Sequence, residues 1–155
     1  MNAGPLLDSV VRALAEARLE AILIGNAAAA LQGAPVTTID FDFMFRSTPV
    51  NLAKLKRFAD RMEAVVLRPY YPVSALFRVM NDQRGLQVDF MPAIHGVKSF
   101  NSLRSRAERI RLGGHDLWVA NLADIIASKR AAGRPQDKAI LGLLEKTLRE
   151  KDQAK

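Results

Sequence analysis

The segment that most constrains this sequence is the run from Thr37 to Phe45, TTIDFDFMF. Its apolar residues alternate with Asp40, Asp42 and Met44, which is the period-two pattern of a β-strand with one buried face. Side chains two residues apart share a face, so the two carboxylates stand roughly 6.6 Å apart, at ~3.3 Å of rise per residue. Aspartate is depleted in strands, and like charges side by side repel. The pair therefore indicates either a cation site or an edge strand with a wet outer face.

The overall composition is that of an ordinary globular protein, with 155 residues, 49% hydrophobic and 25% charged, which fits one domain with a sizeable core. The absence of cysteine excludes a disulfide framework and thiolate chemistry. No apolar run approaches the ~18 residues of a membrane span, and the first residues have neither the basic start nor the apolar run of a signal peptide. We therefore expect a cytoplasmic protein.

The net charge of +7 is distributed unevenly along the chain. Residues 1–97 carry 10 Lys and Arg against 9 Asp and Glu, whereas residues 98–155 carry 13 against 7. A positive field in the C-terminal third suits a polyanion such as RNA or a nucleoside triphosphate. Solubility alone is the simpler explanation of the same charge.

Hydrophobic periodicity and turn residues divide the chain into short helices and strands without an internal repeat. We expect Asn121 to cap one C-terminal helix and Pro135 to begin the next. One domain covers residues 1–150, and residues 151–155 form a frayed tail. The predicted helices are 5–19, 27–33, 49–62, 99–107, 121–132 and 135–150, and the predicted strands are 20–25, 37–45, 64–67, 75–80, 86–91, 109–112 and 116–119.

A third carboxylate, Asp89, has the same phasing in the segment LQVDFM, because Leu86, Val88 and Phe90 share the apolar face and Asp89 lies opposite. Carboxylate oxygens suit Mg²⁺, which keeps waters and substrate phosphates at its other positions. Two such ions ~3.5–4 Å apart can clamp the attacking and leaving oxygens of a phosphoryl transfer. The alternative is that Asp89 is a solvated residue after a hairpin.

Upstream, Gly25-Asn26 joins a short apolar strand to an alanine-rich helix. Free N–H groups at such a helix start can cradle a phosphate, and glycine lets a ligand approach the backbone. A plain strand-to-helix turn with Asn26 as the N-cap is the alternative.

These features in this order resemble the nucleotidyltransferase superfamily, the DNA polymerase β-like fold. Its pattern is a hydrophobic residue, Gly, then Gly or Ser, a spacer, Asp-x-Asp/Glu and a later third carboxylate. Thirteen residues separate Asn26 from Asp40, which falls within the family's range. The segment ILIGNAAAALQGAPVTTIDFDFMF is especially similar to the branch of AbiEii-type toxins and related uncharacterised bacterial proteins. A second segment, VANLADIIASKRAAGRPQDKAILGLL, resembles the C-terminal signature of that branch.

The resemblance implies an α+β nucleotidyltransferase-like fold, a mixed β-sheet flanked by helices and followed by C-terminal helices. It also implies an NTP substrate and one or two Mg²⁺ ions. From the residues alone, Lys129 is an ordinary last-turn lysine and Arg134 forms a local salt bridge with Asp137. The resemblance assigns Asp40, Asp42 and Asp89 to Mg²⁺ ligation and catalysis, with Asp89 helping to deprotonate the acceptor, and Gly25, Asn26, Lys129, Arg130, Arg134 and Asp137 to nucleotide binding.

The expected reaction is transfer of an NMP from the NTP to a hydroxyl of RNA (tRNA-like), a protein or a small molecule. A toxin that pairs with an antitoxin protein is one such enzyme. The family has Gly or Ser where this chain has Asn26, so a second hypothesis remains: a catalytically lapsed module that binds nucleic acid or a partner protein through its basic C-terminal third. A metal-dependent nuclease explains the carboxylates but not Gly25 or Lys129. We assign no role to His95 or His115.

Overall fold

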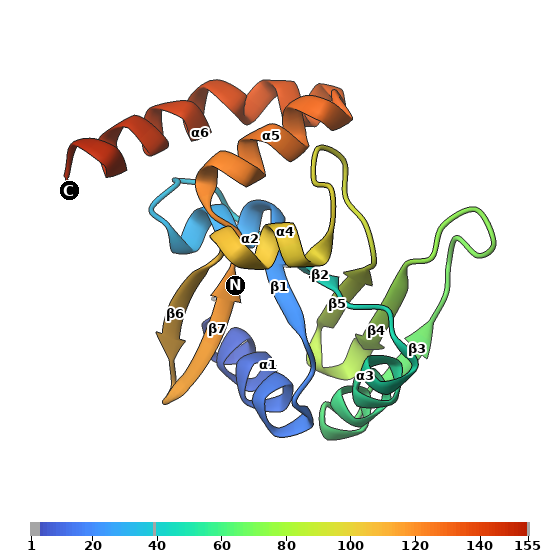
Figure 1. The fold of residues 1–155 in the computed structure, drawn as a ribbon. Coiled ribbons are helices and arrows are strands. Elements are labelled where there is room, and N and C mark those ends of the chain that lie inside the picture. Colours follow the sequence, from blue (N-terminus) through green and yellow to red (C-terminus); the bar gives the residue numbers. More distant parts are fainter. Residues whose placement is uncertain (1–3, 39, 155) are drawn as a thin grey trace.

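Seven strands form one mixed sheet in the order β3-β4-β5-β2-β1-β7-β6 (Figure 1). This computed structural model describes residues 4–38 and 40–154; Ile39 of the predicted strand and Lys155 of the predicted tail lie outside that range. The strands are β1 (Ala21–Ile24), β2 (Phe41–Phe45), β3 (Val65–Leu67), β4 (Phe77–Asn81), β5 (Leu86–Met91), β6 (Glu108–Leu112) and β7 (His115–Val119). The helices are α1 (Gly4–Ala17), α2 (Gly25–Leu31), α3 (Pro49–Arg61), α4 (Phe100–Arg106), α5 (Leu122–Ala132) and α6 (Pro135–Gln153), with a 3₁₀ turn, η1 (Asp82–Arg84). The predicted α+β class and mixed sheet are confirmed.

The helix starts follow local capping chemistry. Asn121 caps α5, since its side-chain oxygen accepts a hydrogen bond from the Asp124 N–H at 2.7 Å, and Pro135 occupies the first turn of α6, both as predicted. Gly133 ends α5 in the left-handed conformation, with φ of 64°. The short link between α5 and α6 is therefore set by its own residues.

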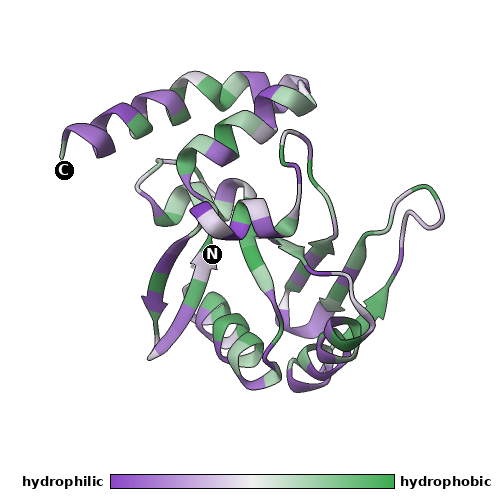
Figure 2. Cartoon of the chain, viewed as in Figure 1, coloured by the Kyte–Doolittle hydropathy of each residue, from purple (hydrophilic) through white to green (hydrophobic). Residues whose placement is uncertain are grey.

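The helices form two groups around the sheet (Figure 1). α1 and α3 lie side by side, and α2, α4, α5 and α6 gather at the opposite end of β1. The apolar residues concentrate on the strands and on the helix faces turned toward them (Figure 2). In the core, Phe43 stacks on Phe90 at 5.3 Å between ring centroids, and Phe58 packs edge-on against Phe90.

None of the described helices is long and apolar enough to cross a membrane.

Strand β2 lies in the interior of the sheet, between β1 and β5, so the edge-strand interpretation is wrong. It pairs antiparallel with β1 and parallel with β5, which sets Asp42 opposite Ile24 on one side and Asp89 on the other. β2 begins at Phe41, later than predicted, so Asp40 precedes the strand. The reason is that β1 ends opposite Asp42 and turns into α2, which leaves the preceding residues without a partner on that side.

The C-terminal tail departs from the prediction. Helix α6 continues to Gln153, so residues 151–153 are helical rather than frayed. The Lys151 ammonium group donates to Gln32 at 3.0 Å and to Glu108 at 2.7 Å, which ties the last turns of α6 to the loop after α2 and to β6. These contacts lie far apart in the sequence and explain why local composition misjudged the helix end.

Candidate active site

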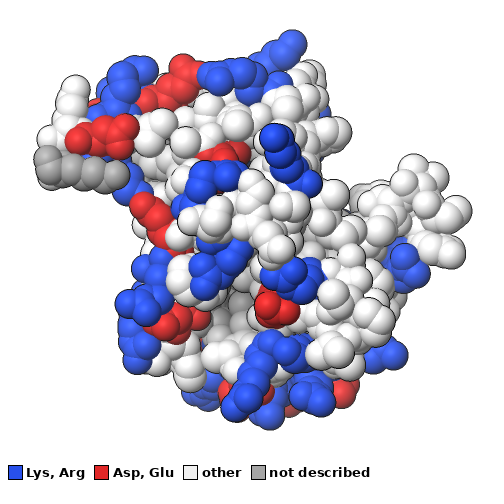
Figure 3. Space-filling view, in the orientation of Figure 1, with Lys and Arg blue, Asp and Glu red and all other residues white. Residues whose placement is uncertain are grey.

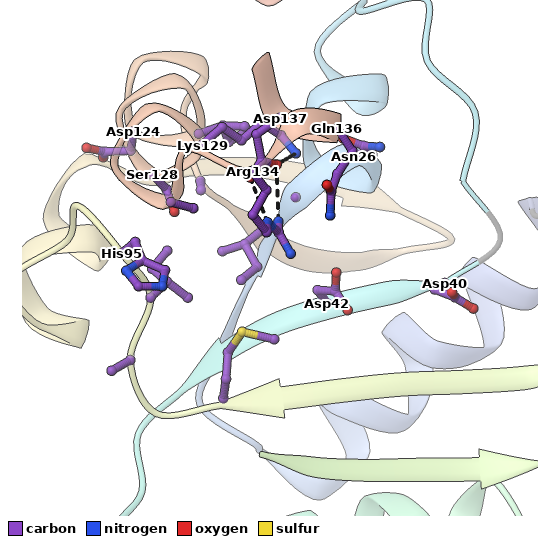
Figure 4. Close-up of a pocket in the computed structure, with 18 of the residues that line it drawn as sticks. Asn26, Asp40, Asp42, His95, Asp124, Ser128, Lys129, Arg134, Gln136 and Asp137 are labelled. Atoms are coloured by element: carbon purple, nitrogen blue, oxygen red, sulfur yellow. Dashed lines mark hydrogen bonds and ion pairs between the residues drawn. The ribbon is translucent and has the colours of Figure 1, made fainter. Parts of the chain in front are cut away.

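A cavity of about 730 Å³ lies between α2, the start of β2, the β5–α4 loop, α5 and the start of α6. Figure 4 shows Asp40 and Asp42 on one side and Lys129 and Arg134, with Asp137 between them, on another. Seven of the nine predicted site residues line it, namely Gly25, Asn26, Asp40, Asp42, Lys129, Arg134 and Asp137. Residues as far apart in the sequence as Gly25 and Asp137 thus meet in one cavity.

The carboxylate side is formed by Asp40 and Asp42. Asp40 is exposed in the segment leading into β2, and Asp42 is half-buried on the strand. Burial, and then the charges of Asp89 and Asp40, raise the pKa of Asp42 from 3.8 to about 6, while Lys129 and Arg134 act in the opposite direction. An ionised Asp42 is therefore unfavourable unless a cation approaches it.

Gly25 and Asn26 form the part of the cavity next to Asp42. Gly25 has φ of +70°, a conformation that favours glycine, and a Cβ built on it would stand 3.4 Å from the Asp42 Oδ2 atom. Asn26 is not the N-cap of α2, because Ile24 takes that position without a side-chain bond. The Asn26 side chain is directed toward the cavity (Figure 4), and its Oδ1 atom is buried without a hydrogen-bond partner among the described residues.

The basic side is organised by Asp137, which is 1% exposed. Its two oxygens accept from Arg134, Oδ2 from Nε at 2.7 Å and Oδ1 from Nη2 at 3.1 Å, and Lys129 Nζ lies 3.6 Å from Oδ1. The hydrogen bonds from Arg134 are the largest cause of the lowered pKa of Asp137. The predicted Arg134–Asp137 salt bridge is present, and Asp137 also holds Lys129. Two cations are thereby fixed across the cavity from Asp42 (Figure 4).

Two predicted site residues do not line the cavity. Arg130 is 62% exposed in its side chain and pairs with Glu145 of α6. It follows Lys129 on α5, and one residue turns a helix by about 100°, so the two side chains point in different directions. Asp89 lies beside Asp42 in the sheet but is only 8% exposed, and both of its oxygens accept hydrogen bonds from Arg78.

No group of three or more His, Cys, Asp or Glu side chains within residues 4–38 and 40–154 has the arrangement of a complete metal site. The predicted cluster of Asp40, Asp42 and Asp89 thus leaves two carboxylates on the cavity and one engaged elsewhere. Because Mg²⁺ commonly takes one or two carboxylates and completes its shell with waters and substrate phosphates, the remaining pair still fits this ion.

The opposite wall of the cavity contains residues to which the sequence pattern assigns no role. His95 lines it from the β5–α4 loop, together with Asp124 and Ser128 of α5 (Figure 4). The loop approaches α5 closely at Gly96, where an added Cβ would stand 2.8 Å from the Ala127 carbonyl oxygen. Only tertiary packing reveals this placement, since the sequence offers no ligand spacing around His95.

No family model and no curated protein matches the sequence. The similar proteins are therefore found by structure alone. The solution structure of the antibiotic-resistance factor ANT(2'')-Ia aligns with a TM-score of 0.65 at 14% identity, over 97% of this chain and 86% of that chain. The crystal structure of ANT(2'')-Ia in complex with adenylyl-2''-tobramycin aligns with a TM-score of 0.67 at 14% identity, over 96% and 90%.

A third solved structure is that of TM1012 from Thermotoga maritima, which is described as a nucleotidyltransferase. It aligns with a TM-score of 0.59 at 20% identity, over 97% of this chain and 92% of that chain. This chain has the nucleotidyltransferase fold. At these identities the likeness concerns the fold, and the AbiEii-type branch stays a prediction.

Proposed function

We propose that this protein is a Mg²⁺-dependent nucleotidyltransferase that moves an NMP from an NTP to an acceptor hydroxyl and releases pyrophosphate. The observation that carries the proposal is the opposition of Asp40 and Asp42 to Lys129 and Arg134 across one cavity. A carboxylate pair suits a hard cation, and a pair of cations held by a buried acid suits a triphosphate.

The chemistry of the carboxylate side supports Mg²⁺. Burial and neighbouring acids raise the pKa of Asp42, so a cation bound beside this carboxylate would be stabilised by it. Mg²⁺ held by Asp40 and Asp42 would neutralise that charge and polarise the phosphoryl oxygens.

The chain's own residues would position the nucleotide. Lys129 and Arg134 would bind phosphate oxygens, and Asp137 would keep both cations in place before the substrate arrives. Asn26 offers an amide donor above Asp42, and Gly25 leaves room beside it. The acceptor oxygen forms a bond to the α-phosphorus while the bond from that phosphorus to the departing pyrophosphate breaks, and the hydroxyl proton is released to water.

The acceptor hydroxyl belongs to RNA, a protein or a small molecule. The cavity of about 730 Å³ has the size of a small-molecule site, and the similar ANT(2'')-Ia is known in complex with adenylyl-2''-tobramycin. A toxin acting on tRNA-like RNA or on a protein, and controlled by an antitoxin, is the narrower form of the proposal that the resemblance to AbiEii-type proteins supports.

The direct test is label transfer from each of the four α-labelled NTPs, with Mg²⁺, to tRNA, to a protein extract and to a panel of hydroxylated small molecules. We expect transfer by the wild type and its loss in Asp40→Ala/Asp42→Ala. The double variant Asp60→Ala/Asp82→Ala, which removes two exposed carboxylates outside the cavity, is the matched control and should retain activity. A wild type that neither transfers label nor binds any NTP with Mg²⁺ contradicts the proposal.

The second candidate is the lapsed module that binds nucleic acid or a partner protein, and the engagement of Asp89 by Arg78 favours it. The basic C-terminal third favours it less, since on the face that Figure 3 shows Lys and Arg stand next to Asp and Glu rather than in one continuous field. RNA binding that survives Asp40→Ala/Asp42→Ala and weakens steeply with salt would identify this alternative. Ion pairs in that third include Arg106–Asp124, Arg111–Asp116, Arg130–Glu145 and Lys151–Glu108.

A further inference from the structure

Three charged residues stand in one row across neighbouring strands of the sheet. Arg78 of β4 is the register partner of Asp89 on β5, and Asp89 is the register partner of Asp42 on β2. Register partners direct their side chains to the same face of a sheet, so a guanidinium, a buried carboxylate and a cavity carboxylate follow one another in that order.

The contact between Arg78 and Asp89 uses both carboxylate oxygens. Nε donates to Oδ1 at 2.9 Å, and Nη2 donates to Oδ2 at 3.1 Å. The side chains are 21% and 11% exposed, so water competes weakly for either partner. The hydrogen bond to Asp89 is the largest cause of the raised pKa of Arg78, which keeps the guanidinium charged. Tyr70, from the loop before β4, lies behind it, with its ring centroid 5.8 Å from Cζ.

A metal ion could bind Asp89 only by displacing this pair. The ion would replace two charge-assisted hydrogen bonds and leave the Arg78 charge without its partner in a mostly buried position, which is strongly unfavourable. A dication and the guanidinium would also stand close together and repel. Asp89 is therefore a poor third ligand although it is the nearest acid to Asp42 in the sheet register.

The charge of the cluster points to the same conclusion. Asp40, Asp42 and Asp89 against Arg78 leave two negative charges, and Lys129 and Arg134 against Asp137 add one positive charge across the cavity. One divalent cation is therefore enough to balance these acids. Without Arg78, the same three acids would favour a second ion, as in sites where two ions lie ~3.5–4 Å apart.

We propose that Arg78 takes the place of a second metal ion: it satisfies Asp89 permanently, and the site holds a single divalent cation on Asp40 and Asp42. This inference rests on the proposed function, and it makes Arg78 a positioning residue that acts through Asp89. The chemical consequence is a nucleotidyltransferase site that works with one ion per nucleotide.

The test counts Mn²⁺ in place of Mg²⁺. Equilibrium dialysis with an α,β-methylene NTP analogue gives the ratio of Mn²⁺ to nucleotide held by the protein, and electron paramagnetic resonance reports whether two Mn²⁺ ions are spin-coupled. We expect a ratio of one and an uncoupled spectrum for the wild type, and the same for Asp89→Asn. Arg78→Met, which frees Asp89, should raise the ratio toward two and introduce coupling, whereas Arg78→Lys, which retains the charge, should stay at one.

A wild-type ratio of two, loss of the ion in Asp89→Asn, or an unchanged ratio in folded Arg78→Met overturns the inference while leaving the proposed function intact. If Arg78→Met does not fold, the wild-type and Asp89→Asn ratios decide without it. A wild type that holds neither Mn²⁺ nor nucleotide overturns the proposed function and this inference with it.

Discussion

Replacing the charge of Asp42 should make the metal-free protein more stable. Burial and neighbouring acids hold the ionised carboxylate in an unfavourable environment, so Asp42→Asn removes a repulsive charge and retains a side chain of almost the same shape. Asp42, which we propose binds the cation, would thus destabilise the folded protein when no cation is bound.

The magnitude follows from the shift of the Asp42 pKa from 3.8 to about 6. One pKa unit corresponds to about 1.4 kcal/mol, so ionised Asp42 costs the folded state about 3 kcal/mol at pH 7. The folded protein binds this proton more tightly than the unfolded chain does, so wild-type stability rises as the pH falls from about 6 toward 4. Because the buried amide of the variant also loses hydration, we expect a gain of about 1–3 kcal/mol at pH 7 that disappears near pH 4.

The assay is urea and thermal unfolding of the wild type and Asp42→Asn at pH 4, 5.5 and 7, without divalent cations. At about 2–4 °C per kcal/mol for a chain of this length, the expected gain raises Tm by about 2–12 °C. Asp60→Asn, on the exposed side of α3, is the control and should change Tm little at any of these pH values. Added Mg²⁺ should then stabilise the wild type but not Asp42→Asn.

Two results would refute this reasoning. A variant less stable than the wild type at pH 7 would mean that Lys129 and Arg134 more than offset the burial of the charge. A stability difference that is constant from pH 4 to 7 would mean that the pKa of Asp42 is not raised.

Three further variants test the surroundings of the cavity. Lys129→Ala should weaken NTP binding about tenfold in isothermal titration, by ~1.4 kcal/mol, whereas Arg130→Ala, its neighbour outside the cavity, should bind like the wild type. Gly96→Ala should lower the free energy of unfolding by about 1–3 kcal/mol, because its methyl group would clash with α5; equal urea midpoints would contradict this. Asp137→Asn should cost about 1–3 kcal/mol at pH 7, and since its pKa is lowered in the fold, the difference from the wild type should shrink below pH 4.

The element order of this fold was predictable because each segment has its own hydrophobic periodicity and its own capping and turn residues. The cap at Asn121 and the proline at position 135 correctly marked where the last two helices begin. The alternation around Asp42 and Asp89 correctly identified two strands with acids on one face. These are local signals, and they remain visible without any knowledge of the neighbours.

The parts that sequence reasoning missed depend on which strands become neighbours. Nothing in the segment FRVMN indicates that Arg78 will stand opposite Asp89, because that pairing requires β4 to lie beside β5 in one register. The end of β1 opposite Asp42, which leaves Asp40 outside the strand, is likewise a property of the sheet. His95 reaches the cavity only because its loop packs on α5.

The pairing of β2 with β5 binds the hydrophobic core and the candidate site into one structural requirement. The alignment that stacks Phe43 on Phe90 also sets Asp42 beside Asp89. Because successive side chains alternate between faces, a slip of one strand by a single residue would drive its carboxylate in among the phenylalanine rings and expose its aromatic residues. The large free-energy cost of such a slip keeps Asp42 and Asp89 in register, so the packing of the phenylalanine rings fixes the relative position of the two acids.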